Sequence, residues 1–318
     1  MTPPPQACFL TSETVDWNVQ TMFVKRISQS SVTVGAPAKV NLDLRVLGRR
    51  PDGYHDIDSL FQAVSLFDRL KITRLDNSTD VQISLAHSVD LPTNDSNLIA
   101  RAFRLMQQRF GLTGGLEVEL EKNIPIAAGL GGGSADGAAT ILACHILFDL
   151  PLTKTEMAAL SIEIGSDLPF FFSSGQAHVT GRGEIVEDVI LPTDYWIVLV
   201  TPPVIVSTAE AYSALKLPLT SSRQPRSFRG WRAPNEFVKW LSDSGNDFEA
   251  VSLSALEHLQ QVKNGLTDTG ALLSRMSGSG PTVFGIYSNA PDLEGDRVLG
   301  RSDWTISTVR PIRLPARL

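Results

Sequence analysis

Residues 125–136 read Pro125-Ile126-Ala127-Ala128-Gly129-Leu130-Gly131-Gly132-Gly133-Ser134-Ala135-Asp136, between a predicted strand at 116–120 and a predicted apolar helix at 138–147. Five of the 24 glycines lie between Gly129 and Gly137. Glycine adopts positive φ and lets the backbone come close to a ligand. The free N–H groups of such a loop, with the positive end of the following helix, form an anion site. The stretch therefore predicts a loop that cradles a polyphosphate.

Two known phosphate-binding patterns do not describe this loop. A P-loop ends in Gly-Lys-Ser/Thr, whereas Gly133 is followed by Ser134 with no lysine. The dinucleotide-binding pattern needs a third glycine where Ser134 or Asp136 stands. A plain flexible turn is the alternative interpretation of a glycine cluster, and the strand and helix on either side count against it.

A second glycine turn, Ser277-Gly278-Ser279-Gly280-Pro281-Thr282, precedes a predicted strand at 282–287. Alone it is typical of an ordinary tight turn. Beside the first loop it indicates a second wall of the same nucleotide site.

The segment Pro37-Ala38-Lys39-Val40-Asn41-Leu42 lies in a predicted strand with period-two alternation. Lys39 and Asn41 are two residues apart, so they share one face of the strand, and Val40 and Leu42 lie on the other. A lysine beside an asparagine can meet a phosphate or a substrate hydroxyl. An exposed polar strand face is the alternative.

The run Gly165-Ser166-Asp167-Leu168-Pro169-Phe170-Phe171-Phe172 places a carboxylate beside three consecutive aromatic residues that must be largely buried. A carboxylate near a dry environment needs a partner, and a lysine is the obvious one. Because serine and aspartate are also good helix caps, a cap is the alternative role of Asp167.

A turn at Asp52-Gly53-Tyr54-His55 presents an aromatic ring and an imidazole together. Tyrosine can stack on a planar base while histidine hydrogen-bonds its edge. An ordinary turn is the alternative. The five histidines include no pair with metalloprotease spacing.

Composition excludes several classes of protein. The 318 residues suggest about two domains, and 28 basic against 34 acidic residues give a net charge of −6, which argues against a general nucleic-acid binder. Cys8 and Cys144 form neither a disulfide framework nor a metal-ligand pattern. No apolar run is long enough to span a bilayer. We therefore expect a soluble, cytoplasmic protein with no nucleic-acid or membrane partner.

Strand and helix patterns alternate without a repeating βα unit, so the fold class expected is α+β rather than a doubly wound sheet. Strands are predicted at 40–46, 70–75, 81–85, 116–120, 177–189, 195–200, 282–287 and 304–309, and helices at 98–106 (capped by Ser96), 138–147, 154–164, 208–215, 237–241 and 253–262.

The expected organisation of the chain is two domains, an N-terminal extension and a basic loop. Residues 32–194 form a first domain that carries the glycine loop, and residues 195–318 form a second. Residues 1–31 are expected to be a disordered extension, or an over-long start with Met22 as the true beginning. The basic stretch at 216–235 is expected to be a solvated loop, with phosphate steering as the alternative.

Taken together and in this order, the motifs resemble the GHMP kinase superfamily, which has an early Pro-x-Ala-Lys-x-Asn segment, a Pro-x-x-x-Gly-Leu-Gly-Gly-Gly-Ser loop and a late Gly-Ser-Gly-Pro turn. The resemblance covers about residues 32–287. Arg50–His55 and Gly165–Pro169 narrow it to members that act on a cytidine-diphosphate-linked methylerythritol. It implies a two-domain fold, with an N-terminal domain like ribosomal protein S5 domain 2 and a ferredoxin-like C-terminal domain.

The resemblance also implies ATP-dependent phosphorylation of the 2-hydroxyl of that substrate, in the non-mevalonate route to isoprenoid precursors. ATP and Mg²⁺ are the implied cofactors, with the Mg²⁺ ligands unassigned. Asp167 would be the catalytic base and Lys39 its charged partner. The cytosine end of the substrate would lie on Tyr54 and His55, and Asn41 near the reacting group. The residues that would hold the ATP phosphates are Pro125, Ala128, Gly129, Leu130, Gly131, Gly132, Gly133 and Ser134.

Alternatives remain at this stage. The first alternative is another GHMP kinase, acting on mevalonate-type, homoserine or sugar substrates. Tyr54 and His55 favour the cytidine substrate over these. A nucleotide-binding regulator without catalysis is the second, and the presence of both Lys39 and Asp167 argues against it. The oligomeric state is left open between monomer and homodimer.

Overall fold

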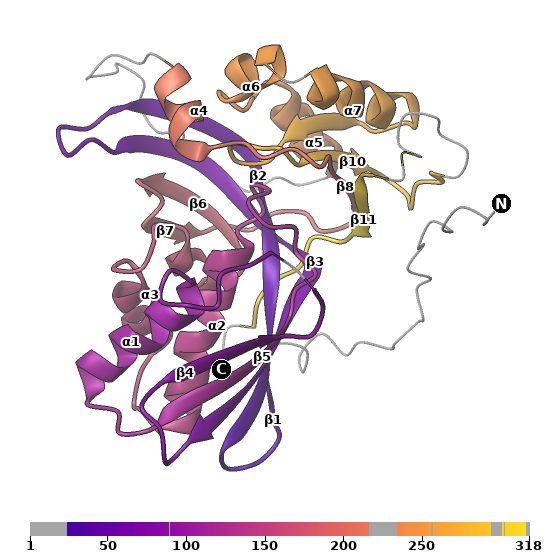
Figure 1. Ribbon diagram of the computed structural model, residues 1–318. Helices are drawn as coiled ribbons and strands as arrows, with labels where there is room; N and C mark the ends of the chain where they lie inside the picture. The colour runs from indigo at the N-terminus through magenta and orange to yellow at the C-terminus, as the bar shows by residue number, and fades with distance from the viewer. Residues whose placement is uncertain are drawn as a thin grey trace.

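The computed structural model describes residues 24–315 apart from 89, 216–233, 256, 294–300 and 302. These residues form two sheets with helices packed on them (Figure 1). The α+β class predicted from the sequence is confirmed.

The larger sheet has the strand order β1-β2-β3-β5-β4, with β6 and β7 continuing from the other half of β3. All pairs are antiparallel except β4 with β5. Its strands are β1 (Val24–Arg26), β2 (Ser31–Arg49), β3 (His55–Leu75), β4 (Val81–Leu85), β5 (Gly115–Glu121), β6 (Gln176–Gly181) and β7 (Ile185–Asp188).

Strands β2 and β3 are the longest of the described strands, with 19 and 21 residues. They form a hairpin within the larger sheet that extends as far as helix α4 (Figure 1). One half of β3, residues 69–75, pairs with β5, and the other half, residues 57–62, pairs with β6. The register shifts between Pro37 and Ala38 and between Asn41 and Asp43. Such irregularities re-aim the side chains beside them, and here they flank Lys39 and Asn41.

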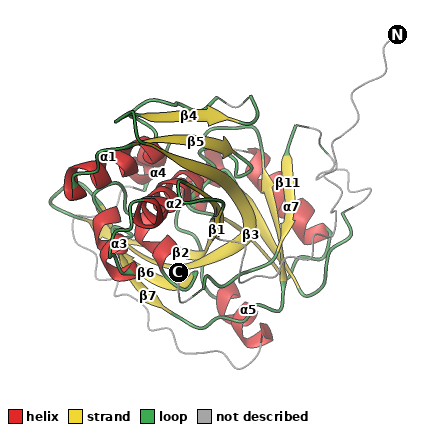
Figure 2. Ribbon diagram, turned by 90° about the horizontal axis from the view of Figure 1, so that it is seen from below, coloured by secondary structure: helices red, strands yellow, loops and turns green. Residues whose placement is uncertain are grey.

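Three helices and a short 3₁₀ helix cover one face of the larger sheet: α1 (Leu98–Phe110), α2 (Gly132–Leu147), α3 (Lys154–Ser161) and η1 (Leu168–Phe172). Figure 2 shows α2 at the centre of this layer. It is apolar on nearly every side because it packs between the sheet, α1 and η1. The predicted cap of α1 was wrong by one residue: Asn97, not Ser96, accepts the hydrogen bond from the N–H of Ile99, at 2.9 Å.

The smaller sheet has the order β11-β8-β10-β9 and is antiparallel throughout. In chain order this is 4-1-3-2, the ferredoxin-like arrangement that was expected. Its strands are β8 (Trp196–Thr201), β9 (Leu273–Met276), β10 (Val283–Tyr287) and β11 (Thr305–Val309), and the helices beside them are α4 (Thr208–Ala214), α5 (Pro234–Ser242), α6 (Glu249–Ala255) and α7 (Glu257–Asp268).

Residues of the two sheets pack together across the predicted domain boundary at 194/195. The position of that boundary stays a prediction. Leu44 and Val46 of β2 lie in one buried cluster with Val198 and Val200 of β8. After β11 the chain returns to the larger sheet, where the N–H of Ile312 donates to the Ala63 carbonyl at 2.9 Å. The division at 195 therefore separates the sheets but not the packing.

The prediction that residues 1–31 are disordered was wrong for its last part. Val24, Lys25 and Arg26 form β1 and pair with β2, and Ser31 begins β2. Val24 also packs against the core of the larger sheet, which explains the order of this segment. The rest of that prediction, with Met22, lies outside the described residues.

The basic stretch at 216–235 lies outside the described part of the chain except for its last two residues, which begin α5. Of the helices that the structure describes, none combines the length and apolar character needed to cross a bilayer.

Candidate active site

The glycine loop has an alternating backbone. Ala127, Gly129 and Gly131 all have positive φ, at 53°, 77° and 71°. A Cβ on Gly129 would lie 2.1 Å from the carbonyl oxygen of Ser277, so only glycine fits there. Positive φ at the non-glycine Ala127 is sparsely populated, and such strain concentrates at functional sites.

The carbonyl groups of this loop are occupied by neighbouring elements. The Ala128 carbonyl accepts from the N–H of Thr282 at 3.3 Å, Gly129 from the Ser277 hydroxyl at 2.9 Å, and Leu130 from the N–H of Lys39 at 2.9 Å. No residue that the structure describes accepts a hydrogen bond from the N–H groups of residues 129–131. Helix α2 begins at Gly132, and the first N–H groups of a helix lack partners within it. The loop therefore offers a row of N–H donors suited to an anion.

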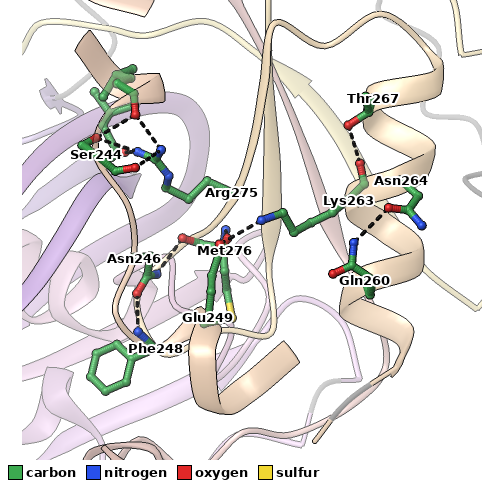
Figure 3. A network of polar contacts seen from close by, with 12 residues as sticks. Ser244, Asn246, Phe248, Glu249, Gln260, Lys263, Asn264, Thr267, Arg275 and Met276 are labelled. Atoms are coloured by element: carbon green, nitrogen blue, oxygen red, sulfur yellow. Dashed lines mark hydrogen bonds and ion pairs between the residues drawn. The ribbon is translucent and has the colours of Figure 1, made fainter. Parts of the chain in front are cut away.

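The second glycine turn lies directly against the first, as expected. A Cβ on Gly278 would lie 3.2 Å from the Cα of Gly129. Behind the turn, the Asn246 amide donates to the carbonyls of Met276 and Gly278, at 2.8 and 2.7 Å. The Glu249 carboxylate accepts from the N–H of Met276 at 2.7 Å (Figure 3). These contacts fix the turn from the side of the smaller sheet.

Arg275 joins the same network to the larger sheet. Its guanidinium donates to the Leu42 carbonyl at 2.6 Å and to the Leu241 carbonyl at 2.7 Å. The side chain is buried, and burial lowers the pKa of Arg275 to about 10. Its hydrogen bond to Leu42 joins β9 to β2, and hence holds the second turn close to the first loop.

Lys39 is buried, being only 3% exposed, although its strand face was open to an exposed interpretation. Its ammonium donates to the Asn41 amide oxygen at 2.6 Å, lies 3.5 Å from a carboxylate oxygen of Asp167, and sits 4.5 Å from the centre of the Phe61 ring. Burial lowers the pKa of Lys39, and the Asp167 carboxylate opposes that shift. The structure thus brings together the lysine and the aspartate that the resemblance paired, and their catalytic roles stay predictions.

Asn41 is held at both ends. Its backbone N–H donates to the Ser277 hydroxyl at 3.1 Å, and its side-chain amide donates to the Ser59 hydroxyl at 3.0 Å. Its amide oxygen therefore has a fixed position facing Lys39. This orientation connects the strand to the second glycine turn.

Asp167 stands at the start of η1, but its side chain makes no capping hydrogen bond. The capping alternative therefore does not describe it. The side chain is 34% exposed, which is less buried than its aromatic neighbours suggested. A carboxylate that is partly open and only loosely paired at 3.5 Å can still accept a proton from an incoming hydroxyl.

Tyr54 and His55 lie at the far end of the β2–β3 hairpin, and the structure does not bring them into direct contact with Lys39 or Asp167. Tyr54 is 55% exposed, with the Arg182 guanidinium 4.8 Å from its ring centre. His55 stacks on the ring of Tyr212 at 4.6 Å and 23°. Burial, and then the charge of Arg49, lowers the pKa of His55, which favours the neutral imidazole.

Two residues that the sequence did not single out connect these groups to Asp167. The neighbour of Arg182, Gly183, comes so close that a Cβ there would lie 3.3 Å from a carboxylate oxygen of Asp167. Burial, and then the Asp167 charge, raises the pKa of Tyr212. The sequence analysis gave only a predicted strand over this segment, 177–189, in which Gly181 and Gly183 stand on either side of Arg182.

In the described part of the chain, the candidate site coincides neither with a preformed metal site nor with an apolar cavity. The described ranges contain no group of three or more histidine, cysteine, aspartate or glutamate side chains placed to hold a metal ion. An apolar cavity lies between β2, α2 and the C-terminal segment, lined among others by Ala138, Leu142 and Leu314. None of the predicted site residues lines it.

The fold and the double glycine turn agree with comparisons to known proteins. The family model for the GHMP kinases N terminal domain matches residues 97–175, and that for the GHMP kinases C terminal matches residues 228–297. These matches define the class of the protein as a GHMP kinase.

Individual relatives narrow this class. The 4-diphosphocytidyl-2-C-methyl-D-erythritol kinase of Exiguobacterium sibiricum is 39% identical over 80% of this chain and 89% of its own length. The protein of the same name from Syntrophotalea carbinolica is 38% identical over 87% of this chain and 98% of its own. The chain belongs to this family of GHMP kinases.

Solved structures support the same family. A crystal structure of 4-(cytidine 5'-diphospho)-2C-methyl-D-erythritol kinase matches with a TM-score of 0.68 and 32% identity, over 87% of this chain and 99% of that one. A homoserine kinase from Cytophaga hutchinsonii matches with a TM-score of 0.62 at 18% identity, over 92% of this chain and 98% of that one. The second match concerns the fold alone.

Proposed function

We propose that this chain transfers the γ-phosphoryl group of ATP to the 2-hydroxyl of 4-diphosphocytidyl-2-C-methyl-D-erythritol. The observation that carries the proposal is the pair of Lys39 and Asp167 beside the glycine loop, 3.5 Å apart. A buried ammonium next to a partly open carboxylate suits transfer to an alcohol. Membership of the family supports the choice of acceptor.

The ATP phosphates would lie on the N–H groups of residues 129–134. Pro125 leads into this loop, and the buried Ala128 anchors it through its bond to Thr282. When bound, Mg²⁺ would offset charge on the β- and γ-phosphates. An ion carried by phosphates and water needs only one or two protein ligands, which fits a chain whose described residues hold no larger cluster.

Asp167 would accept the proton of the attacking hydroxyl. Lys39 would offset the negative charge of Asp167 and of the transferring group. Asn41, whose amide is fixed by Ser59 and faces the ammonium, would keep Lys39 in place beside the reacting group. Phosphoryl transfer depends mainly on such positioning and charge.

The cytosine would bind at Tyr54 and His55. A neutral imidazole can both donate to and accept from the edge of a base, and an exposed tyrosine ring can stack on it. Arg182 lies over Tyr54, and a Cβ on its neighbour Gly183 would lie 3.3 Å from a carboxylate oxygen of Asp167. The charge of Arg182 would therefore lie between the cytosine end and the reacting end of the substrate. We assign it to the diphosphate, because a guanidinium matches phosphate geometry.

All these residues come from one chain, so we propose that each copy holds a complete site, as a monomer or in a homodimer. We also propose that the protein acts in the cytoplasm, a reducing compartment, because its two cysteines form no disulfide framework.

The test is a coupled ADP-release assay with 4-diphosphocytidyl-2-C-methyl-D-erythritol, mevalonate and homoserine as separate acceptors. We expect turnover with the first acceptor alone. We expect His55→Ala to raise the KM for this acceptor about tenfold and to leave the KM for ATP unchanged. Faster turnover with mevalonate or homoserine would replace the proposal with the other kinase activity, and ATP binding without transfer to any acceptor would leave a regulator.

A further inference from the structure

A second lysine lies under the glycine loop and has no part in the function proposed above. Lys122 directly follows β5, and its side chain is only 4% exposed. Its ammonium pairs with Asp68 of β3, which is fully buried, and lies 3.3 Å from a carboxylate oxygen of Asp136 on α2. One ammonium thus joins β3, the end of β5 and the helix that begins at the end of the phosphate loop.

Asp68 also fixes the chain that leads into the loop. Its second carboxylate oxygen accepts the backbone N–H of Asn123 at 2.7 Å and that of Ile124 at 2.8 Å. The residue after Ile124 is Pro125, the first of the glycine-rich stretch. The entry to the loop is therefore bonded to the same carboxylate that holds Lys122.

The first residue of α2 lies directly on this lysine. A Cβ on Gly132 would lie 2.9 Å from the Lys122 ammonium nitrogen and 2.9 Å from a methyl of Ile124. Glycine at 132 is therefore required for the helix to sit so close to the charge. A positive charge at this distance also adds to the positive end of the helix.

Asp136 closes the cluster from the helix. One of its carboxylate oxygens, buried, has no hydrogen-bond partner in the described part of the chain. Burial, and then the charge of Asp68, raises the pKa of Asp136 well above its usual range, against the effect of Lys122. Both effects favour a protonated Asp136, which adds no negative charge near the site where phosphate is to bind.

We propose that Lys122 is a positioning residue of the phosphate loop: held between Asp68 and Asp136, it clamps the first turns of α2 to β3 and β5 and so keeps the loop N–H groups arranged for the phosphates of ATP. The inference rests on the proposed function only in taking ATP as the ligand. A buried ion pair that served stability alone would not affect nucleotide affinity in the folded enzyme, and this difference is what the experiment measures.

The experiment uses the double variant Lys122→Met/Asp68→Asn. Lys122→Met alone would leave Asp68 charged and unpaired in the interior, which endangers folding. The amide oxygen of Asp68→Asn still accepts the N–H groups of residues 123 and 124, so the double variant removes the charges and keeps that contact. Lys71→Met is the matched control, because Lys71 pairs with Glu119 across the same two strands, at 2.5 Å, and both side chains are about half exposed.

Two measurements are made on folded protein: the Kd of ADP and of a non-hydrolysable ATP analogue by calorimetry, and the KM for ATP with kcat. We expect the double variant to raise both Kd values and the KM for ATP about tenfold, with kcat at saturating ATP within about threefold of wild type. Lys71→Met should change none of them.

Nucleotide Kd values within about twofold of wild type in the folded double variant would overturn the proposal, as would a loss confined to kcat. Calorimetry needs no acceptor substrate. If the wild type failed to phosphorylate 4-diphosphocytidyl-2-C-methyl-D-erythritol while the double variant still lost nucleotide affinity, the proposed function would fail and this inference would stand.

Discussion

Two lysines flank the glycine loop, and they are held in opposite ways. Lys39 approaches Gly131, where a Cβ would lie 2.9 Å from its side chain, and Lys122 approaches Gly132 at the same distance. Both are buried, Lys39 on β2 and Lys122 directly after β5, and both face aspartate. The surroundings of each aspartate separate their roles.

Around Lys122, the charges are closed in. Its partner Asp68 is fully buried and also accepts two backbone N–H groups, so that pair is saturated. Around Lys39, the contact is loose: Asp167 is 3.5 Å away, caps nothing and is 34% exposed. A saturated pair can fix a backbone, whereas a loose and partly open pair leaves its carboxylate free to take a proton. The predictions below test that division of roles.

The largest expected effect is that of Lys39→Met, which should lower kcat about a thousandfold. Stability should not fall, because burial already disfavours the charged form of Lys39 and Asp167 remains partly solvated. Steady-state kinetics and thermal unfolding of the same sample check both parts. A variant that kept its kcat, or that lost several degrees in Tm, would contradict the catalytic role of Lys39. Lys39 would then hold the backbone in place, as Lys122 does.

A smaller effect is expected from Gly131→Ala. The added Cβ would lie 2.9 Å from the Lys39 side chain, at a φ of 71° that alanine rarely adopts. We expect kcat/KM for ATP to fall about a hundredfold and the unfolding free energy to fall by about 1–2 kcal/mol. Kinetics and urea denaturation measure these, and Gly53→Ala, also at positive φ but with open space around it, is the control. Equal kinetic losses in both variants would refute the role of close packing on Lys39.

Arg182→Ala should act on the acceptor alone. Because its guanidinium lies over Tyr54, we expect the KM for the cytidine substrate to rise about tenfold at an unchanged KM for ATP. Arg182→Lys should recover part of the loss, since charge is kept and the planar fork is not. A rise in the KM for ATP instead would contradict the assignment.

The smallest effect concerns Asp136 and is one of pH. A carboxyl whose pKa is raised in the folded state binds more protons there than in the unfolded state, so its contribution to stability falls as pH rises above the ordinary value near 4. Each pH unit between the unfolded and folded pKa costs about 1.4 kcal/mol. The Tm of Asp136→Asn should therefore gain on wild type between pH 4 and 7. Parallel Tm profiles of the two proteins would show that Asp136 is ionised in the fold.

The sequence indicated the loose cluster of Lys39, Asn41 and Asp167 but not the saturated pair of Lys122 and Asp68. Lys39, Asn41 and Asp167 each stand in a short motif whose local pattern can be recognised, and the glycine loop sets the place where they meet. Asp68 on β3 and Lys122 directly after β5 are 54 residues apart, and no local periodicity brings them together.

Tertiary packing also explains the other differences. Tyr212 stacks on His55 from helix α4, beside the smaller sheet, and no spacing along the chain could indicate this contact. The strand at 70–75 was predicted, whereas β3 begins at His55 because its first half pairs with β6. The short strand β9 was not predicted, since its four residues include polar Ser274 and the buried Arg275.

The most direct test of the account compares wild type with Asp167→Asn, which keeps the shape of the side chain and removes the base. Product formation from ATP and 4-diphosphocytidyl-2-C-methyl-D-erythritol is followed by phosphorus NMR, with nucleotide Kd measured on the same samples. The account predicts a new phosphomonoester on the 2-hydroxyl with wild type. It predicts at least about a thousandfold slower formation with the variant, at an unchanged Kd for ADP. A variant that formed the same product at a rate near wild type would contradict it.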